Sequence, residues 1–186
     1  NYLLPKLISE LNYTHKNIQI NLKIATTKAI LSRLLTFNID VALIEANCFS
    51  DKVHTYPWKK DELVIIASPK YPLSKKKKLT LSDIANARWL LRKQSSSIRE
   101  KLEEKIGGKI RPFLELDDTD ALKQATQAGL GISCLSRFVV EDSLKNNTLV
   151  ELKTPFLTLS REFYILIHKE KYQSTVISEF LKKANT

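Results

Sequence analysis

The chain has 186 residues, of which 43% are hydrophobic, and this is enough for one ordinary globular domain or two small ones. It carries 30 lysines and arginines against 20 aspartates and glutamates, which gives a formal net charge of +10. No run of about 18 apolar residues occurs, so the sequence predicts no membrane span and no membrane partner. The two cysteines, Cys48 and Cys134, lie far apart in apolar stretches. They predict buried free thiols in a reducing cytoplasm rather than a disulfide scaffold.

The positive charge is compatible with work near DNA or with acidic ligands, and it establishes neither. The densest basic run, Lys75 to Lys78, has no aromatic residue within it, which favours a solvated loop over a nucleic-acid surface. The sequence begins at Asn1 and contains no methionine. We therefore expect a fragment or a processed product of a longer protein.

The first third of the chain predicts a helix, a strand, a helix and a strand. Apolar residues at helical spacing predict a helix over residues 3–12, and strict alternation predicts a half-buried strand over residues 18–24. Thr26 or Thr27 would then cap a helix that runs to about residue 37. The unbroken apolar run over residues 39–45 is typical of a central parallel strand and completes a βαβ unit.

The remainder continues the alternation of strands and helices, which predicts an α/β fold with largely parallel sheets. Expected strands cover residues 61–68, 87–92, 111–116, 132–135, 148–152 and 161–169, and expected helices cover residues 81–85, 95–106, 118–128, 136–146 and 174–184.

Two of the four glycines form the motif Gly129-Leu130-Gly131. A phosphate-binding loop requires the order strand, glycine-rich turn, helix, because the phosphate lies at the N-terminus of the helix that follows. Here a helix precedes the glycines and a strand follows them. Gly129 is therefore expected to end a helix in the left-handed conformation, and Gly131 to permit close backbone packing.

Two α/β units in a chain of this length predict two small lobes with a ligand cleft between them. The chain would leave the first lobe along the strand near residue 66 and return along the strand near residue 166. Lobe I is then residues 1–66 with 166–186, and lobe II is residues 67–165.

Seven stretches follow one another in an order and spacing that are typical of a known family. They are NYLLPKLISEL, ATTKAILSRLL, IDVALIE, DELVIIASPKYPL, LSDIANARWLLRKQSSSIREKLEE, DTDALKQATQAGLGISCLSR and FYILIHKEKYQSTVISEFL.

Together, over essentially the whole chain, these stretches resemble the effector-binding domain of LysR-type transcriptional regulators. The resemblance implies two Rossmann-like lobes of periplasmic-binding-protein type II, joined by two crossover strands. It also implies a small, anionic effector in the interlobe cleft, promoter DNA bound only through an N-terminal winged helix-turn-helix outside this chain, and a homodimer that can become a tetramer at full length. In this family a first strand usually precedes the position of Asn1, so one wall of the pocket is expected to be incomplete.

The resemblance, together with the preference of helix N-termini for anions, selects polar residues at strand ends and helix starts as the effector site. The QSSS turn lacks the glycine found in many members of the family, and each hydroxyl has an alternative role as a helix cap. The expected effector-binding residues are Thr26, Thr27, Ser68, Gln94, Ser95, Ser96, Ser97 and Thr119.

The implied dimer places the first helix, Leu3 to Asn12, against the helix from Asp120 to Ala128 of the partner. The alternative for these apolar faces is packing inside one chain, and both can hold in part. The expected interface residues are Leu4, Leu7, Ile8, Leu11, Leu122, Lys123 and Thr126.

Other classes of function have less support. The three histidines lack a paired carboxylate or nucleophile at recognisable spacing, and Asp117 with Asp118 is better explained as a helix cap. We therefore expect no enzyme, cofactor or metal site. A free-standing periplasmic solute-binding protein of the same fold is the main alternative to a regulator.

Overall fold

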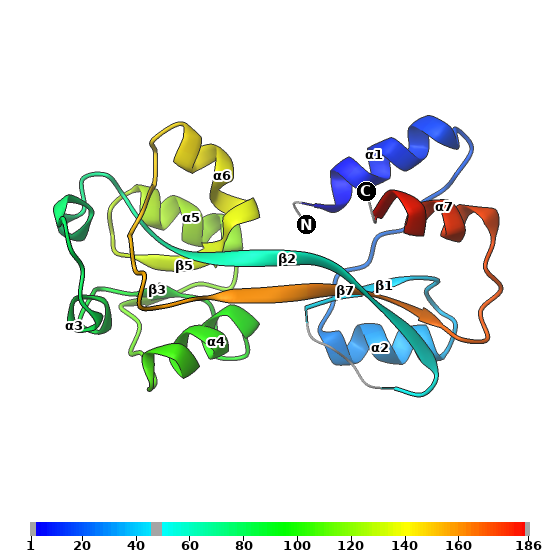
Figure 1. Cartoon of the computed structure of the whole chain (residues 1–186), viewed down its shortest axis with the longest axis horizontal. Helices are drawn as coiled ribbons and strands as arrows, with labels where there is room; N and C mark the ends of the chain where they lie inside the picture. The colour runs from blue at the N-terminus through cyan, green and yellow to red at the C-terminus, as the bar shows by residue number, and fades with distance from the viewer. Residues whose placement is uncertain (1–2, 46–49, 185–186) are drawn as a thin grey trace. The chain divides into compact units, whose positions relative to one another are not determined.

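The computed structural model describes residues 3–45 and 50–184, and Cys48 lies outside them. The chain forms two compact units, residues 1–60 with 161–186 and residues 61–160. Both boundaries fall on long strands, β2 (Val53–Ala67) and β7 (Ser160–His168), which Figure 1 shows. The boundaries expected from the sequence, near residues 66 and 166, lie on the same two strands. No helix in the described ranges is long and apolar enough to cross a membrane.

The first unit contains helices α1 (Leu4–Thr14), α2 (Thr27–Leu35) and α7 (Thr175–Ala184) and strand β1 (Ala42–Ile44). Their apolar faces form two buried clusters, one around α2 and β1 and one around α1 and α7. Trp58 belongs to the second cluster, and its indole N–H donates to the carbonyl of Ala184 over 2.8 Å. The helical periodicities of the sequence therefore correspond to real buried faces.

The prediction of a strand over residues 18–24 is wrong. These residues form no strand ladder in the described structure, and Ile20, Leu22 and Ile24 are 38%, 51% and 71% exposed. Alternation of apolar residues predicts a strand only when a neighbouring strand and a core are available to accept it. The described part of the first unit supplies neither at this position, so the expected βαβ unit does not form.

The second unit places helices on both faces of the end of β2. It contains the short 3-10 helix η1 (Pro72–Lys75), helices α3 (Leu81–Ala85), α4 (Ser97–Ile106), α5 (Thr119–Gln127) and α6 (Arg137–Lys145), and strands β3 (Leu90–Leu91), β4 (Leu114–Glu115), β5 (Ser133–Ser136) and β6 (Val150–Glu151).

Alternation along β2 divides the core of the second unit into two layers. Leu63 and Ile65 pack with the cluster that includes α3 and α4, whereas Val64 and Ile66 pack with the cluster that includes α5 and α6. Figure 1 shows α4 on one side of β2 and β5, and α5 and α6 on the other. Because successive side chains of a strand point to opposite faces, one apolar run can serve both layers.

The expectation of largely parallel sheets is also wrong. In the described residues β1 pairs with β7, and β2 pairs with β5 and with β6, all antiparallel. Only β3 and β4 form a parallel ladder, and a single parallel bridge joins Trp89 to Ile132. The order of elements predicts parallel pairing for strands that are neighbours in the chain, but here the long strands β2 and β7 pair with partners that run the opposite way.

The interpretation of the two glycines is confirmed. Helix α5 ends at Gln127, Gly129 follows with φ +83°, and strand β5 begins at Ser133. At Gly131 a Cβ atom would lie 2.2 Å from the carbonyl oxygen of Arg88, so only glycine fits without a shift of the backbone. These glycines shape the unit and form no phosphate loop.

Candidate functional site

Strands β3 and β4 are parallel, so their carboxyl ends meet at one edge of the second unit. Arg92 and the QSSS turn, residues 94–97, follow β3, and Asp117 to Thr119 follow β4. The carboxyl ends of parallel strands are the common position for ligands in α/β folds. Most of the polar residues that the sequence analysis selected in this unit are therefore gathered at one edge.

Arg92 and Thr119 are in direct contact at this edge, and we call the pair the Arg92 site. Nη1 of Arg92 donates to Oγ1 of Thr119 over 2.7 Å. The side chain of Arg92 is half-buried, and its Nε is fully buried without a hydrogen-bond acceptor among the described residues. No carboxylate in the described ranges forms an ion pair with it. A partly desolvated cation without an anionic partner is costly, and a bound anion would remove that cost.

The acidic side chains near the Arg92 site are engaged elsewhere. Asp117 pairs with Lys93 at 3.5 Å, and Asp118 accepts from the backbone N–H of Ala121 at 2.7 Å. Glu115 accepts from Arg99 at 2.6 Å. These carboxylates therefore leave the charge of Arg92 uncompensated.

Arg99 supports the Arg92 site from within the core. Burial opposes the charge of Arg99, but hydrogen bonds to Glu103 and Glu115 outweigh burial and raise the pKa of Arg99. Its guanidinium also donates to the carbonyl oxygen of Arg92 over 3.0 Å. The backbone of Arg92 is therefore held by a permanently charged, buried neighbour.

The QSSS turn lies between β3 and the N-terminus of α4. Gln94, Ser95 and Ser97 are exposed, and Ser96 is half-buried. Ser96 occupies the N-cap position of α4, but its side chain makes no capping hydrogen bond. The helix-cap alternative therefore does not account for the Ser96 hydroxyl.

In the first unit, Thr26 and Thr27 are both exposed at the start of α2. Oγ1 of Thr26 accepts from the backbone N–H of Ala29 over 3.4 Å, so Thr26 is the N-cap, one of the two alternatives that the sequence left open. A contribution of these two threonines to an effector site stays a prediction.

The structure does not bring Ser68 to the Arg92 site. Ser68 is buried after the end of β2, where its Oγ accepts from the backbone N–H of Lys70 at 3.5 Å. A Cβ atom on Gly129, just beyond the C-terminus of α5, would lie 3.9 Å from the Cβ of Ser68. Thr119 begins the same helix, whose nine residues span about 13 Å at 1.5 Å per residue. Ser68 and Thr119 therefore lie toward opposite ends of α5.

The expected dimer residues divide between the interior and the surface of their own units. Leu7, Leu11, Leu122 and Thr126 are buried, and Thr126 donates its hydroxyl hydrogen to the carbonyl of Leu122 over 2.8 Å. Packing within the chain, the alternative for these faces, therefore holds for these four. The remaining expected interface residues, Leu4, Ile8 and Lys123, are half-buried.

Sequence reasoning missed Arg92 and the pair formed by Asp61 and Ser136. The Ser136 hydroxyl donates to Asp61 over 2.6 Å, and both residues are almost fully buried. The signal for Arg92 was available, because it follows a buried strand directly, as do the polar residues that were selected. The signal for Asp61 was masked, because a charged residue at the start of an apolar run looks like an exposed strand end.

The chain matches the LysR substrate binding domain family over residues 1–184. It belongs to that family. It is 35% identical over 184 residues to the HTH-type transcriptional regulator YeiE of Escherichia coli K12, covering 97% of the chain and 62% of YeiE. It is 30% identical to the HTH-type transcriptional activator CmpR of Synechocystis, covering 97% of the chain and 60% of CmpR. The chain thus spans about three fifths of these relatives.

Solved structures show the same fold. The CcmR regulatory domain from Synechocystis, in complex with 2-PG, has a TM-score of 0.84 at 24% identity and covers 99% of this chain and 90% of that one. The cofactor-binding domain of the Cbl transcriptional regulator has a TM-score of 0.86 at 21% identity and covers 100% of this chain and 82% of that one. The effector-binding domain of QuiR, in complex with shikimate, has a TM-score of 0.78 at 21% identity and covers 98% of this chain and 88% of that one.

The chain is therefore an effector-binding regulatory domain of the LysR type. Its α/β fold is that of LysR regulatory domains, which are of periplasmic-binding-protein type II. Domains of this family serve transcription regulators and are not enzymes.

Proposed function

We propose that this domain senses a small anionic effector and that Arg92 binds the effector's acidic group. The observation that carries the proposal is the guanidinium of Arg92, which is held by Thr119, has a buried Nε without an acceptor and lacks an ion pair in the described residues. A guanidinium offers a fork of N–H donors that matches the two oxygens of a carboxylate or phosphate. The anion would pair with the guanidinium, and a shift of the Arg92 side chain on binding would bring Nε the acceptor that it lacks.

The surroundings of Arg92 support an anion over a neutral ligand. The side chain of Ser96 makes no capping hydrogen bond, and the N-terminus of α4 favours negative charge. The hydroxyl and amide groups of Gln94, Ser95, Ser96 and Ser97 would complete the contacts. A hydrogen bond to a charged group contributes about 1.5–3 kcal/mol, so Arg92 would supply a large part of the affinity for a small ligand.

Two related solved domains support a small molecule as the effector. CcmR was solved with 2-PG and QuiR with shikimate. Both are small molecules, and neither identifies the effector of this chain. For this chain we expect an interlobe site, to which Thr26 and Thr27 would contribute.

The regulatory step would be a shift of populations. An effector that binds one arrangement of the protein more tightly than another favours that arrangement by the difference in binding free energy. In the longer protein the change would pass to an N-terminal winged helix-turn-helix that binds promoter DNA in the cytoplasm. We expect the domain to form a symmetric homodimer, which can become a tetramer at full length.

A thermal-shift screen of small carboxylates and phosphates tests the proposal, because a ligand that binds only the folded chain raises its unfolding temperature. Hits are then measured by calorimetry on the wild type, Arg92→Gln and Arg33→Gln, since Arg33 is an exposed arginine of the first unit. We expect Arg92→Gln to weaken the hit about 10- to 100-fold, the equivalent of one charged hydrogen bond, and Arg33→Gln to leave it unchanged.

Replacing Ser95, Ser96 and Ser97 together by alanine is a second arm of the same experiment, and this triple change should abolish the hits. A hit that binds Arg92→Gln and the triple variant as tightly as the wild type would overturn the proposal.

A further inference from the structure

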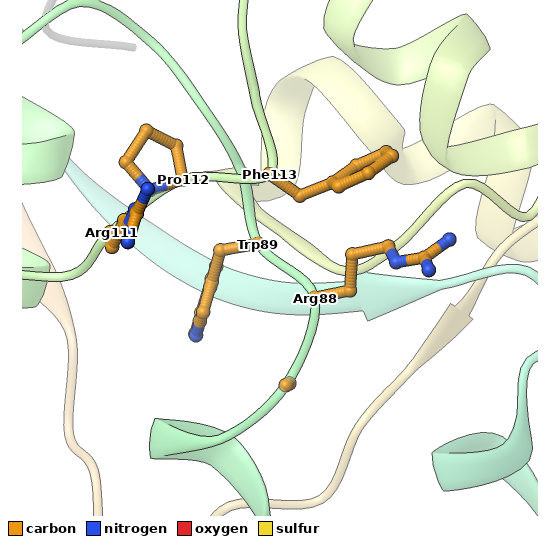
Figure 2. A pocket seen from close by; sticks show the side chains of 6 residues that line it. Arg88, Trp89, Arg111, Pro112 and Phe113 are labelled. Atoms are coloured by element: carbon orange, nitrogen blue, oxygen red, sulfur yellow. The ribbon is translucent and has the colours of Figure 1, made fainter.

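A second basic feature lies at the opposite edge of the same two strands. Residues just before β3 and just before β4 line an open hollow of about 390 Å³, which Figure 2 shows and which we call the Arg88 hollow. Because β3 and β4 are parallel, their amino ends meet at this edge, away from Arg92 and the QSSS turn at the carboxyl ends. The hollow is lined by Ala87, Arg88, Trp89, Arg111, Pro112 and Phe113.

The backbone of the Arg88 hollow is fixed by hydrogen bonds. The carbonyl of Arg88 accepts from the N–H of Ile132 at 2.9 Å, and the carbonyl of Trp89 accepts from the N–H of Phe113 at 2.8 Å. Trp89 is fully buried, and its indole N–H donates to the carbonyl of Ile84 at 2.8 Å. The backbone that carries the lining side chains is therefore held by hydrogen bonds to the rest of the unit.

The side chains that the hollow presents carry unmatched positive charge. The guanidinium of Arg88 lies 4.3 Å over the ring of Phe113, which is itself 56% exposed. Neither Arg88 nor Arg111 forms an ion pair with a carboxylate in the described part of the chain. By contrast, Arg99, Arg137 and Arg161 each pair with a glutamate.

Figure 2 shows the two guanidiniums separated: Arg88 extends with Phe113 to one side of Trp89, and Arg111 lies with Pro112 on the other. One small acidic group cannot contact both. We propose that the Arg88 hollow binds a small dianion whose two acidic groups sit at opposite ends of the molecule, as in a dicarboxylate or a bisphosphate. One acidic group pairs with Arg88, the other pairs with Arg111, and the part between them lies against Pro112 and outside the fully buried Trp89.

Size and chemistry limit the ligand. A hollow of about 390 Å³ is at the lower end of the range for small-molecule sites, so its size suits a metabolite. Guanidiniums match the oxygens of carboxylates and phosphates equally well. Whether the ligand is a dicarboxylate or a bisphosphate is therefore decided by titrating both classes.

The two tryptophans of the chain make a local test possible. Trp89 belongs to the hollow, whereas Trp58 lies in the first unit with its indole N–H bonded to Ala184. In proton–nitrogen NMR spectra of the whole chain, we titrate linear dicarboxylates of increasing length, bisphosphates, and a monocarboxylate and a monophosphate as controls. We expect the indole signal of Trp89 to shift with a dianion of matching length, and that of Trp58 to stay in place.

Substitutions then show which arginines bind the two acidic groups of the dianion. Because both arginines are exposed, Arg88→Gln and Arg111→Gln should each weaken the dianion only about two- to fivefold, and the double variant about tenfold or more. Arg33→Gln and Arg92→Gln should not change this affinity. Insensitivity to Arg92→Gln separates the hollow from the effector proposal, so either can fail alone.

Three results would overturn the inference. One is that no dianion shifts Trp89 at millimolar concentration. Another is that the monoanions bind as tightly as the best dianion. The third is that the double variant binds the dianion as tightly as the wild type.

Discussion

The two edges of the β3 and β4 pair both carry guanidiniums without carboxylate partners in the described ranges, but they differ in burial. Arg92, beyond the carboxyl ends, is half-buried and bonded to Thr119, whereas Arg88 and Arg111, before the amino ends, are exposed. Water and salt screen an exposed charge, so an added anion stabilises it little. A desolvated charge gains more from the same anion. Burial, and not the number of arginines, therefore makes the Arg92 site the stronger candidate for the effector.

The largest loss of stability is expected from a substitution that disturbs the backbone beside the Arg88 hollow. In Gly131→Ala the new Cβ would lie 2.2 Å from the carbonyl oxygen of Arg88, which is backbone and cannot rotate away. Overpacking of this kind costs typically about 1–3 kcal/mol of unfolding free energy, and we expect the upper end of that range. Urea denaturation measures the loss. Gly108→Ala is the control, because nothing lies within 4 Å of its new Cβ.

An equal loss of stability in the two glycine variants would contradict a clash between the new Cβ at position 131 and the carbonyl oxygen of Arg88. Loss of binding at the Arg88 hollow with an intact Arg92 site would show that the two edges can be disrupted separately.

The next largest loss of stability is expected from removing the hydrogen bond between Arg92 and Thr119. Thr119→Val keeps the shape of the side chain but leaves Nη1 of Arg92 without its partner at 2.7 Å. An unsatisfied, partly buried donor costs about 1–3 kcal/mol, and we expect a loss of unfolding free energy within that range. Thr119→Ser should restore most of it, because it returns the hydroxyl. If the valine variant is as stable as the serine variant, the hydrogen bond does not hold Arg92.

A smaller difference in stability is expected between substitutions at the N-termini of α4 and α5, which both lie at the Arg92 edge. Asp118 caps α5 through the N–H of Ala121 at 2.7 Å, whereas the side chain of Ser96 makes no capping hydrogen bond to α4. Asp118→Ala should therefore cost about 1 kcal/mol of unfolding free energy, and Ser96→Ala close to nothing. Thermal denaturation without ligand measures both. Equal losses would mean that Ser96 is a structural cap and not a group reserved for the effector.

The smallest effect concerns an acidic side chain on the helix that leads to Arg88. Hydrogen bonds from Lys76 and from the backbone N–H of Thr80 lower the pKa of Asp83 from 3.8 to about 2. Because the folded pKa lies below the unfolded one, the stability that Asp83 contributes is present above pH 3.8 and is lost as the pH falls through about 2. An NMR titration of its carboxyl carbon should give a pKa that rises in Lys76→Gln. A pKa that does not change in this variant would contradict the ion pair.

Local signals in the sequence were sufficient for most helices and their ends. Thr26 and Asp118 cap α2 and α5, Gly129 follows α5 in the left-handed conformation, and α3 covers residues 81–85 as expected. Capping and glycine conformation depend on a few neighbouring residues, so they can be read without the tertiary structure.

Pairing of strands depends on distant residues, and there the sequence was insufficient. Residues 18–24 have the alternation of a strand, but no described strand accepts them, and their apolar side chains stay exposed. The same limit explains the direction of the sheets, since β1 pairs with β7, more than a hundred residues away.

The candidate site was predictable in part for the same reason. The rule that polar residues follow parallel strands found the QSSS turn and Thr119 and could have found Arg92. It could not reveal that Nε of Arg92 is buried without an acceptor, because that depends on how β3, α5 and their neighbours pack. It also misplaced Ser68, which follows the longer, antiparallel strand β2 and lies toward the other end of α5.

The most direct test of Arg92 as the group that binds the effector is the nitrogen NMR signal of its Nε during a titration with the best anion from the screen. We expect this signal to shift as the anion pairs with the guanidinium and supplies the missing acceptor, while the Nε signal of Arg88 does not move. An anion that saturates the domain and leaves the Arg92 signal unchanged would contradict the assignment of Arg92 as the group that binds the effector.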